Sequence, residues 1–385
     1  MLAVRRVLLY TGLIIKETGY SFMAKQRDTV LDAMRGIGIV LMVVGHSGFG
    51  GTDFIYLFHM ALFFMLSGYF FRPAQDGAGL RRFCIRRVVT LWLPFVLTNT
   101  AFTVCNNLFL KLNILTGDER ILDLPGNQVT QPVTLKDIIG RTVHWCIFDG
   151  GTQLGGALWF VQALFQISIL YALVEFVLRK ALHDRDVQTA QGFVSGVLLI
   201  LGWHCSQTGW NVWGLGIAAS CYSLFYLGTL ARRVGQPPRK VPVRAGIAAA
   251  AFVVLLVLLP FGSVGLAGNQ YPGWLFLLLA SSAGWVLVYE CAHLAARLPR
   301  LGAALAALGR ATMPIVILHF LSFKLVTWLG LLATGGEAYL LAAFPTLFTG
   351  GAWWLAYTAA GLLLPLAAYQ PYRMLKTRLL CRLRR

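Results

Sequence analysis

Charged residues, and acidic ones above all, are scarce in this sequence. Asp and Glu account for 15 of its 385 residues, and charged residues of both signs together make up 12%. Hydrophobic residues make up 57%. This composition argues against a soluble domain and predicts an integral membrane protein. Apolar windows long enough to span a bilayer recur along the whole length, which favours one polytopic domain without a separable soluble enzyme.

Several familiar site signatures are also missing. The sequence contains no P-loop, no Rossmann glycine fingerprint and no HExxH motif, and it shows no clear internal repeat. Its 7 cysteines are scattered and form no CxxC pair. This pattern predicts neither a zinc site nor a disulfide framework, so we expect no metal in the protein.

The positive charge has a topological explanation. The net charge is +18, but the basic residues cluster in short segments between apolar windows. The positive-inside rule predicts this distribution for cytoplasmic loops, so we expect a lipid bilayer as the partner of this protein, and no nucleic acid.

The apolar windows predict an all-α bundle of about ten transmembrane helices. Basic loops follow the second, fourth, sixth and eighth windows, whereas the alternate loops carry little positive charge. This alternation predicts ten spans with both termini in the cytoplasm. The fifth window is unusually short. The ten windows are 30–48, 54–71, 88–110, 157–178, 191–204, 213–231, 245–265, 272–293, 312–331 and 349–368.

The two ends of the chain differ from this transmembrane region, which we place at residues 23–370. The apolar run Val7–Ile15 is too short to span comfortably, and a polar segment after Met23 leads into the first window. We therefore expect residues 1–22 to be an N-terminal extension, whose presence mass spectrometry of the mature protein would test. Residues 371–385 form a basic cytoplasmic tail.

The first window carries a polar stripe that is costly inside a bilayer and typical of a working site. Asp32 and Arg35 are three residues apart, and His46 follows Arg35 by eleven. At about 100° per residue these spacings place the three side chains on one side of a helix, with His46 roughly 16 Å beyond Arg35. In the predicted topology, Asp32 and Arg35 lie toward the cytoplasm and His46 toward the opposite face.

These three residues are the leading catalytic candidates. His46 can take and return a proton near neutral pH, although a histidine at a helix end can also simply bond a backbone carbonyl. Arg35 can bind an anionic group or brace Asp32 in a structural ion pair, and the two roles are compatible.

Two further histidines lie in apolar windows. His59 begins the second window, near the same face as His46, and an assisting role is as plausible there as a structural one. His319 follows Pro314 in the ninth window and is either a functional group or a buried polar link between helices. Ser67 and Gly68 favour close helix packing.

A basic cluster and an aromatic residue complete the candidate site. Five arginines lie between residues 72 and 87. They either set topology alone or bind a polyanionic group such as a phosphorylated nucleotide. Trp159 opens the fourth window, where an interfacial anchor is the simpler interpretation.

The order of these motifs resembles the acyltransferase-3 family of bacterial membrane acyltransferases. Val30–Val40, His46 and Phe58–Tyr69 resemble the start of that family, with Arg35 and His46 meeting its Arg-x10-His signature. Leu158–Phe165 is similar to its middle segment and Leu308–His319 to its late helix. The resemblance is closest to the smaller fucose-4-O-acetylase-like members.

This resemblance implies a reaction and a location. It implies transfer of an acyl group, most simply acetyl, from cytoplasmic acyl-CoA to a hydroxyl of a glycan or glycolipid at the bacterial inner membrane. His46 would act as general base, or form a covalent acyl intermediate, assisted by His59 or His319. Arg35 would orient the donor, with Asp32 as its support.

The resemblance also assigns a donor site. The family carries an Arg-x-x-Arg pair after its second helix, and here Arg87 fits the first position while Thr90 occupies the second. Arg86 or Arg82 would compensate, and Trp159 is assigned to donor binding with them. A transporter or flippase for a lipid-linked saccharide is the alternative, since intramembrane Arg and His also line translocation paths.

Overall fold

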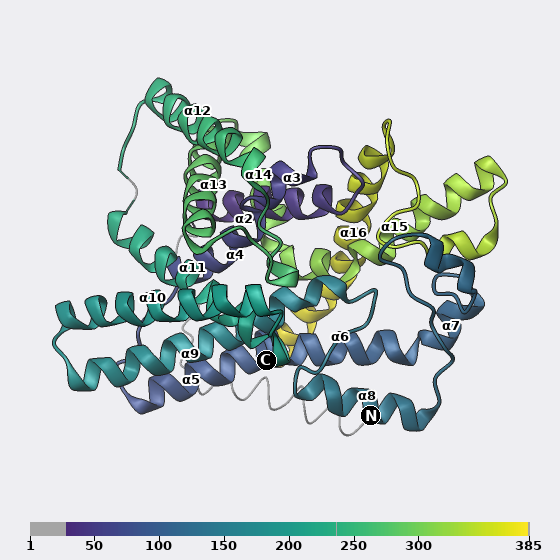
Figure 1. Cartoon of the computed structure of the whole chain (residues 1–385), viewed down its shortest axis with the longest axis horizontal. Coiled ribbons are helices and arrows are strands. Elements are labelled where there is room, and N and C mark those ends of the chain that lie inside the picture. The colour runs from purple at the N-terminus through teal and green to yellow at the C-terminus, as the bar shows by residue number, and fades with distance from the viewer. Residues whose placement is uncertain (1–27, 236, 384–385) are drawn as a thin grey trace.

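A computed structural model describes residues 28–235 and 237–383, and every regular element in these ranges is a helix (Figure 1). The predicted extension, residues 1–22, lies outside the described residues, as do residues 384 and 385 of the predicted tail. The α-helices are α2 (Thr29–Gly45), α3 (Thr52–Tyr56), α4 (His59–Tyr69), α5 (Gly77–Arg87), α6 (Leu93–Val104), α7 (Asn106–Lys111), α8 (Leu135–Cys146), α9 (Trp159–Ala181), α10 (Asp184–Thr208), α11 (Leu215–Val234), α12 (Val241–Leu258), α13 (Trp274–Ala295), α14 (Pro299–Arg310), α15 (Thr312–Thr334) and α16 (Trp353–Leu383).

The all-α membrane fold predicted from the sequence is confirmed. Within the described ranges, 6 helical stretches are long and apolar enough to cross a membrane, judged by length and composition. The count of ten spans and the orientation of the termini stay predictions. The six stretches are Gly77–Val104, Gly156–Ala181, Val212–Val234, Val241–Phe261, Trp274–Ala295 and Thr312–Thr334.

The structure differs from the predicted windows in three places. The second window is split into α3 and α4, because the backbone at Phe58 (φ −151°, ψ −18°) is not helical. The short fifth window lies within α10, which has 25 residues. Helices α8 and α14, of 12 residues each, were read as parts of loops, because a search for long apolar windows overlooks short helices with a polar face.

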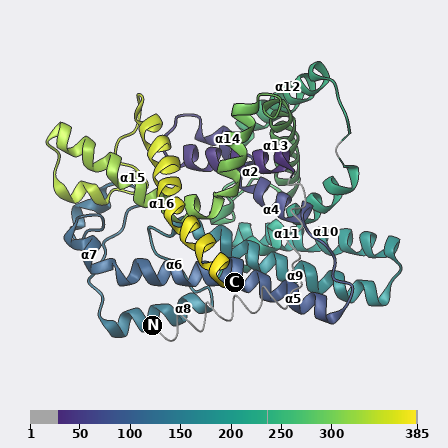
Figure 2. The same cartoon turned by 180° about the vertical axis from the view of Figure 1, so that it is seen from behind.

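Helix α2 lies inside the bundle and packs against α14, α13, α4, α15 and α16 (Figures 1 and 2). Its contact with α14 is a direct backbone contact. A Cβ atom at Gly36 would lie 2.0 Å from the carbonyl oxygen of Leu305, and one at Gly309 would lie 1.9 Å from that of Asp32. Glycine is therefore required on both helices, and this crossing fixes the start of α2 against the end of α14.

The helix-packing interpretation of Ser67 and Gly68 also agrees with the structure. A Cβ atom at Gly68 would lie 1.9 Å from the carbonyl oxygen of Phe225 in α11. The Ser67 hydroxyl donates a hydrogen bond to the Phe63 carbonyl one turn earlier, at 2.8 Å. Gly68 thus lets α4 and α11 approach, while Ser67 satisfies its own polar group.

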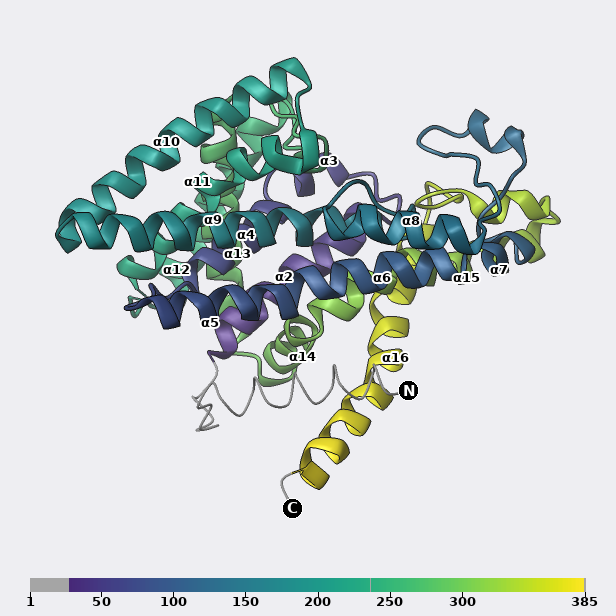
Figure 3. The same cartoon turned by 90° about the horizontal axis from the view of Figure 1, so that it is seen from below.

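Helices α5 and α6 form one long helical stretch that runs beside α9 (Figure 3). The two are joined by a π-helical turn at Val88–Trp92. Pro94 explains this turn, because it has no N–H to donate to the Thr90 carbonyl four residues earlier. The Thr90 hydroxyl donates instead to the Arg86 carbonyl, at 2.7 Å.

A buried lysine holds the segment that follows α15. Lys324 is 4% exposed, and its ammonium group donates to the carbonyls of residues 341, 342 and 343 at 3.1, 2.9 and 2.7 Å. The next residue, Phe344, places its ring 4.5 Å from that of Phe320. Lys324 therefore has a structural role here, and it positions an aromatic ring beside the neighbour of His319.

A surface ion pair joins the same segment to the loop after α7. Arg120 contacts Glu337 at 2.7 Å and Asp118 at 2.8 Å. The hydrogen bond from the Arg120 side chain lowers the pKa of Asp118. The loop between α7 and α8 is therefore tied to the segment that carries Phe344.

Candidate active site

The first turns of α2 carry the predicted charges. Asp32 is 6% exposed, and its carboxylate lies 3.3 Å from Arg35 and 3.8 Å from Arg310 of α14. The Arg35 guanidinium also lies over the Phe70 ring, 4.3 Å from its centroid. Two cations therefore bracket one buried carboxylate. The ion pair proposed for Asp32 and Arg35 is present, and the extra positive charge suits an anionic ligand.

The other end of α2 carries His46, which directly follows its last residue. The His46 ring stacks on that of His319 in α15, with centroids 5.4 Å apart and an angle of 26° between the planes. Phe320 lies 5.0 Å from His46. Two histidines that are 273 positions apart in the sequence thus meet at one point.

The hydrogen bonds of His319 fix its tautomer. Its Nδ1 lies 3.0 Å from the Ile315 carbonyl oxygen and 3.1 Å from that of Val316. A carbonyl can only accept, so Nδ1 carries the proton and Nε2 keeps a lone pair. This Nε2 is buried and has no hydrogen-bond partner among the described residues, and the same is true of His46 Nδ1. A lone pair on an imidazole nitrogen can accept a proton.

His59 lies near the same end of α2 as His46. Its Nδ1 lies 2.9 Å from the Ile55 carbonyl oxygen, which again leaves the lone pair on Nε2. Its ring stacks on Tyr56 at 4.9 Å, and the Tyr56 hydroxyl donates to the Gly45 carbonyl at 3.2 Å. Tyr56, the last residue of α3, therefore holds His59 near the end of α2.

His46 and His59 line the same small cavity. It has a volume of about 70 Å³ and is lined by His46, His59, Tyr56 and Trp159, among others. A space of this size accommodates a small group or a few water molecules. The structure thus brings His46, His59 and His319 together, and it places Asp32 and Arg35 at the opposite end of α2.

The predicted donor residues are divided between two places. Arg82, Arg86 and Arg87 lie on α5, where Arg82 is 4.0 Å from Asp76 and Arg87 lies over the Phe83 ring at 4.9 Å. Trp159 opens α9 and lines both the histidine cavity and a larger one beside it. The residues that line these two cavities include none of the three arginines. Trp159 is thus a neighbour of the histidines.

Sequence reasoning missed two members of this arrangement. Arg310 was counted only as a topological charge, and Tyr56 was not considered. The Gly309-Arg310 pair before the proline-containing helix is a signal for the first, since glycine permits the close crossing that brings Arg310 to Asp32. For Tyr56 the sequence offers no comparable signal.

The described residues offer no ready metal site. Among residues 28–235 and 237–383, no group of three or more His, Cys, Asp or Glu side chains is arranged to hold a metal ion. Six cysteines in this part of the chain are free thiols. The described side chains at the two ends of α2 are imidazoles, arginines and a carboxylate.

A comparison with protein families identifies the class of the whole helical region. Residues 28–370 match the family model described as an acyltransferase domain, acyltransferase 3. The match covers most of the chain, so the protein belongs to the acyltransferase-3 family and is a membrane acyltransferase. No curated protein and no solved structure matches the chain.

Proposed function

We propose that this protein moves an acyl group, most simply acetyl, from cytoplasmic acyl-CoA to a hydroxyl of a glycan or glycolipid on the other side of the bacterial inner membrane. The observation that carries the proposal is the histidine cluster at one end of α2, with a pair of arginines at the other. The two ends provide the two functions that such a transfer needs, a proton acceptor and a site for an anion.

The reaction needs one base, which takes the proton of the acceptor hydroxyl and gives it to the departing thiolate. The hydroxyl oxygen of the acceptor bonds to the acyl carbonyl carbon while His46 takes the hydroxyl proton. The carbon–sulfur bond of the thioester breaks, and the departing thiolate receives the proton from His46. The products are an ester and free CoA. His59 and His319 orient or assist His46, with their lone pairs on Nε2.

The donor side uses the arginines. Arg82, Arg86 and Arg87 would hold the phosphates of CoA, because guanidinium groups form charge-assisted hydrogen bonds with phosphate. The narrow pantetheine arm would then pass Arg35 and Arg310 toward the histidines. This route requires ten spans with both termini in the cytoplasm, as the loop charges predict. Cysteine-labelling from each side of the membrane, in the loop before α11 and the loop before α12, tests that topology.

The decisive experiment measures transfer and donor cleavage. Purified protein in nanodiscs is given radiolabelled acetyl-CoA with a glycolipid extract, and labelled ester and free CoA are both counted. We expect His46→Ala to lose about 10²–10⁴-fold in rate while keeping its expression level. His204→Ala, which changes an exposed histidine of α10, is the matched control and keeps the rate.

Wild-type turnover in His46→Ala would disprove the assignment of the base. A preparation that moves a lipid-linked saccharide across the membrane without consuming acetyl-CoA would instead support the transporter. Label that stays on the denatured wild-type protein, and is absent from His46→Ala, would identify the covalent acyl-His46 route.

A further inference from the structure

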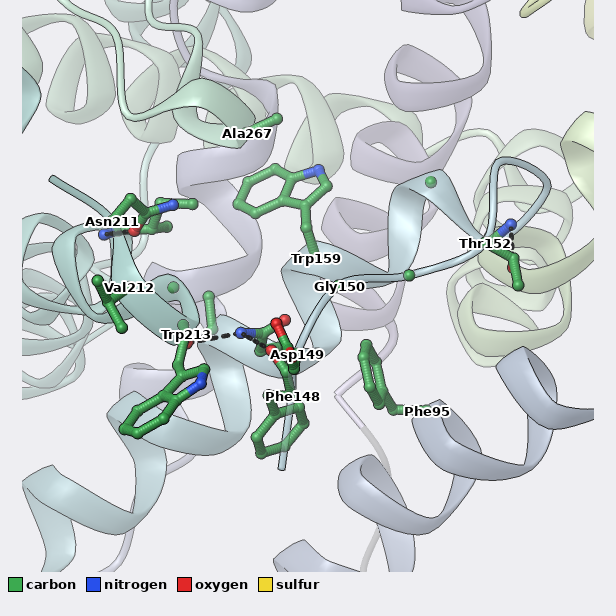
Figure 4. Close-up of a pocket in the computed structure, with 17 residues that line it drawn as sticks. Phe95, Phe148, Asp149, Gly150, Thr152, Trp159, Asn211, Val212, Trp213 and Ala267 are labelled. Carbon is green, nitrogen blue, oxygen red and sulfur yellow. Dashed lines mark hydrogen bonds between the residues drawn. The ribbon is translucent and has the colours of Figure 1, made fainter. Parts of the chain in front are cut away.

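A larger cavity lies directly beside the histidine cavity. It has a volume of about 580 Å³, within the range of small-molecule binding sites. Trp159 and Ala267 line both cavities. Figure 4 shows the indole of Trp159 extending toward Ala267 between the two walls of the large cavity. A molecule in the large cavity would therefore lie one side chain away from His46.

The walls of this cavity combine aromatic rings with polar groups. Trp159 contributes an indole, and Asp149 and Asn211 contribute oxygen and nitrogen atoms that can bond hydroxyl groups (Figure 4). A sugar ring has this mixed character, because its C–H faces pack on aromatic rings and its rim of hydroxyl groups needs hydrogen-bond partners.

Side-chain amides stabilise a rare backbone conformation in the cavity walls. Phe148 and Trp213 both line the cavity and both have positive φ, 61° and 51°, a conformation that bulky residues rarely adopt. Gln162 donates to the Trp213 carbonyl at 2.7 Å and lies 3.5 Å from that of Phe148, and Gln166 donates to the Trp213 carbonyl at 2.7 Å. Strain that is held by such bonds is typical of ligand sites.

The glycine-rich loop at the edge of the cavity is also held by a side-chain amide. Asn99 of α6 is fully buried, and its side-chain oxygen accepts hydrogen bonds from both the backbone N–H and the hydroxyl of Thr152, each at 2.9 Å. The loop that carries Asp149 is thus anchored to α6 three residues later. The cavity is a formed site rather than a gap between mobile loops.

The charged groups that line the cavity favour neutral sugars over acidic sugars. Among the residues that line it in the described chain, Asp149 is the one acidic side chain. Its carboxylate lies 2.6 Å from Nδ1 of His144, which is exposed and does not line the cavity. The lining contains no Arg or Lys to pair with the carboxylate of an acidic sugar, which would instead meet Asp149.

We propose that this cavity binds one neutral sugar ring and excludes acidic sugars such as uronic acids. The ring lies against Trp159, with hydroxyl groups bonded to Asp149 and Asn211. Its place in catalysis rests on the proposed function, in which this ring belongs to the acceptor and its free hydroxyl lies on the Trp159 side, toward His46. The binding of sugar itself does not depend on acyl transfer.

The test measures binding without chemistry. Saturation-transfer difference NMR on the full chain in nanodiscs uses methyl α-D-glucopyranoside, methyl α-D-galactopyranoside and methyl β-D-glucuronide as probes. We expect a signal from at least one neutral glycoside and at least a fivefold weaker one from the glucuronide. Asp149→Asn, which removes the charge at an exposed position, should bring the glucuronide signal up toward the neutral ones.

A second variant tests the location. Ala267→Trp places a large ring at an exposed position that faces both cavities and should abolish the neutral signal. Ala250→Trp adds the same ring on an exposed face of α12 and should leave the signal unchanged. Equal signals from neutral and acidic probes, or a neutral signal that survives Ala267→Trp, would overturn the proposal.

The two proposals fail separately. A neutral signal that is retained by His46→Ala, in a protein that does not consume acetyl-CoA, would remove the proposed function and leave the sugar site. Acetyl transfer that Ala267→Trp does not slow, in a protein that binds none of the probes, would remove the sugar site and leave the proposed function.

Discussion

The two ends of α2 place their polar side chains in different environments. At its start, Asp32 is buried but its arginine partners are partly exposed, with side chains of Arg35 and Arg310 that are 34% and 42% accessible. At its end, His319 is fully buried and His46 stacks against it. The two guanidinium groups are therefore partly exposed around a buried carboxylate, whereas the imidazoles at the other end pack against each other. Burying a charge is far more costly than burying an imidazole.

In the proposed reaction, this difference lets the two ends of one helix interact with two different substrates. A charged end can attract a phosphorylated donor from water and exchange it. A neutral, enclosed end can hold a proton acceptor without competition from bulk water. The variants below test whether these two environments are separate, and they are ordered from the largest expected effect to the smallest.

The largest effect should come from the histidine end. We expect His319→Ala to reduce acyl transfer by about 10²-fold, because His46 loses the ring against which it stacks. If the two residues act as a unit, His46→Ala/His319→Ala will be no slower than His46→Ala alone. Rates of labelled ester formation for the four proteins complete the cycle. Losses that simply multiply would show that His319 acts independently.

The next effect should come from the crossing between α2 and α14. In Gly309→Ala the new Cβ would lie 1.9 Å from the Asp32 carbonyl oxygen, so the helices must separate. We expect a loss of about 1–3 kcal/mol in stability, the usual cost of overpacking. Thermal unfolding in detergent measures it.

The matched control for this glycine is Gly196 of α10, where a Cβ atom would meet nothing within 4 Å. We expect Gly196→Ala to be neutral or to stabilise the helix by about 0.5–1 kcal/mol. An equally stable Gly309→Ala would contradict the backbone contact between α2 and α14.

The smallest effect should come from the charged end. We expect Arg35→Ala to raise KM for acetyl-CoA about tenfold and Arg310→Ala about threefold, because Arg35 is closer to Asp32 and less exposed. In both variants kcat should change less than KM. Steady-state kinetics at two salt concentrations provide the measurement. A fall in kcat alone would place Arg35 in the chemical step rather than in donor binding.

Local patterns were enough to predict the polar stripe. The spacings of Asp32, Arg35 and His46 depend only on the repeat of an α-helix, and the structure has the ion pair and the helix that this repeat requires. The membrane-embedded, all-α class followed from composition in the same way.

Contacts between distant segments could not be predicted in this way. Trp159 lies in a segment that is similar to the family's middle segment, and its neighbours are set by the packing of α9 on α4. The stacking of His46 on His319 and the approach of Arg310 to Asp32 also depend on helices from opposite ends of the chain. The split at Phe58 reflects a backbone conformation that no apolar window reveals.

The glycine contact between α2 and α14 has a consequence for the choice of donor. The charged residues and His46 lie at opposite ends of one helix, so their separation is a fixed length, and the two backbone contacts hold that helix against α14. In the proposed reaction the donor must bridge that length, and its acyl group must then fit a space of about 70 Å³. The fixed separation and the small cavity would together select a donor that carries a short acyl chain.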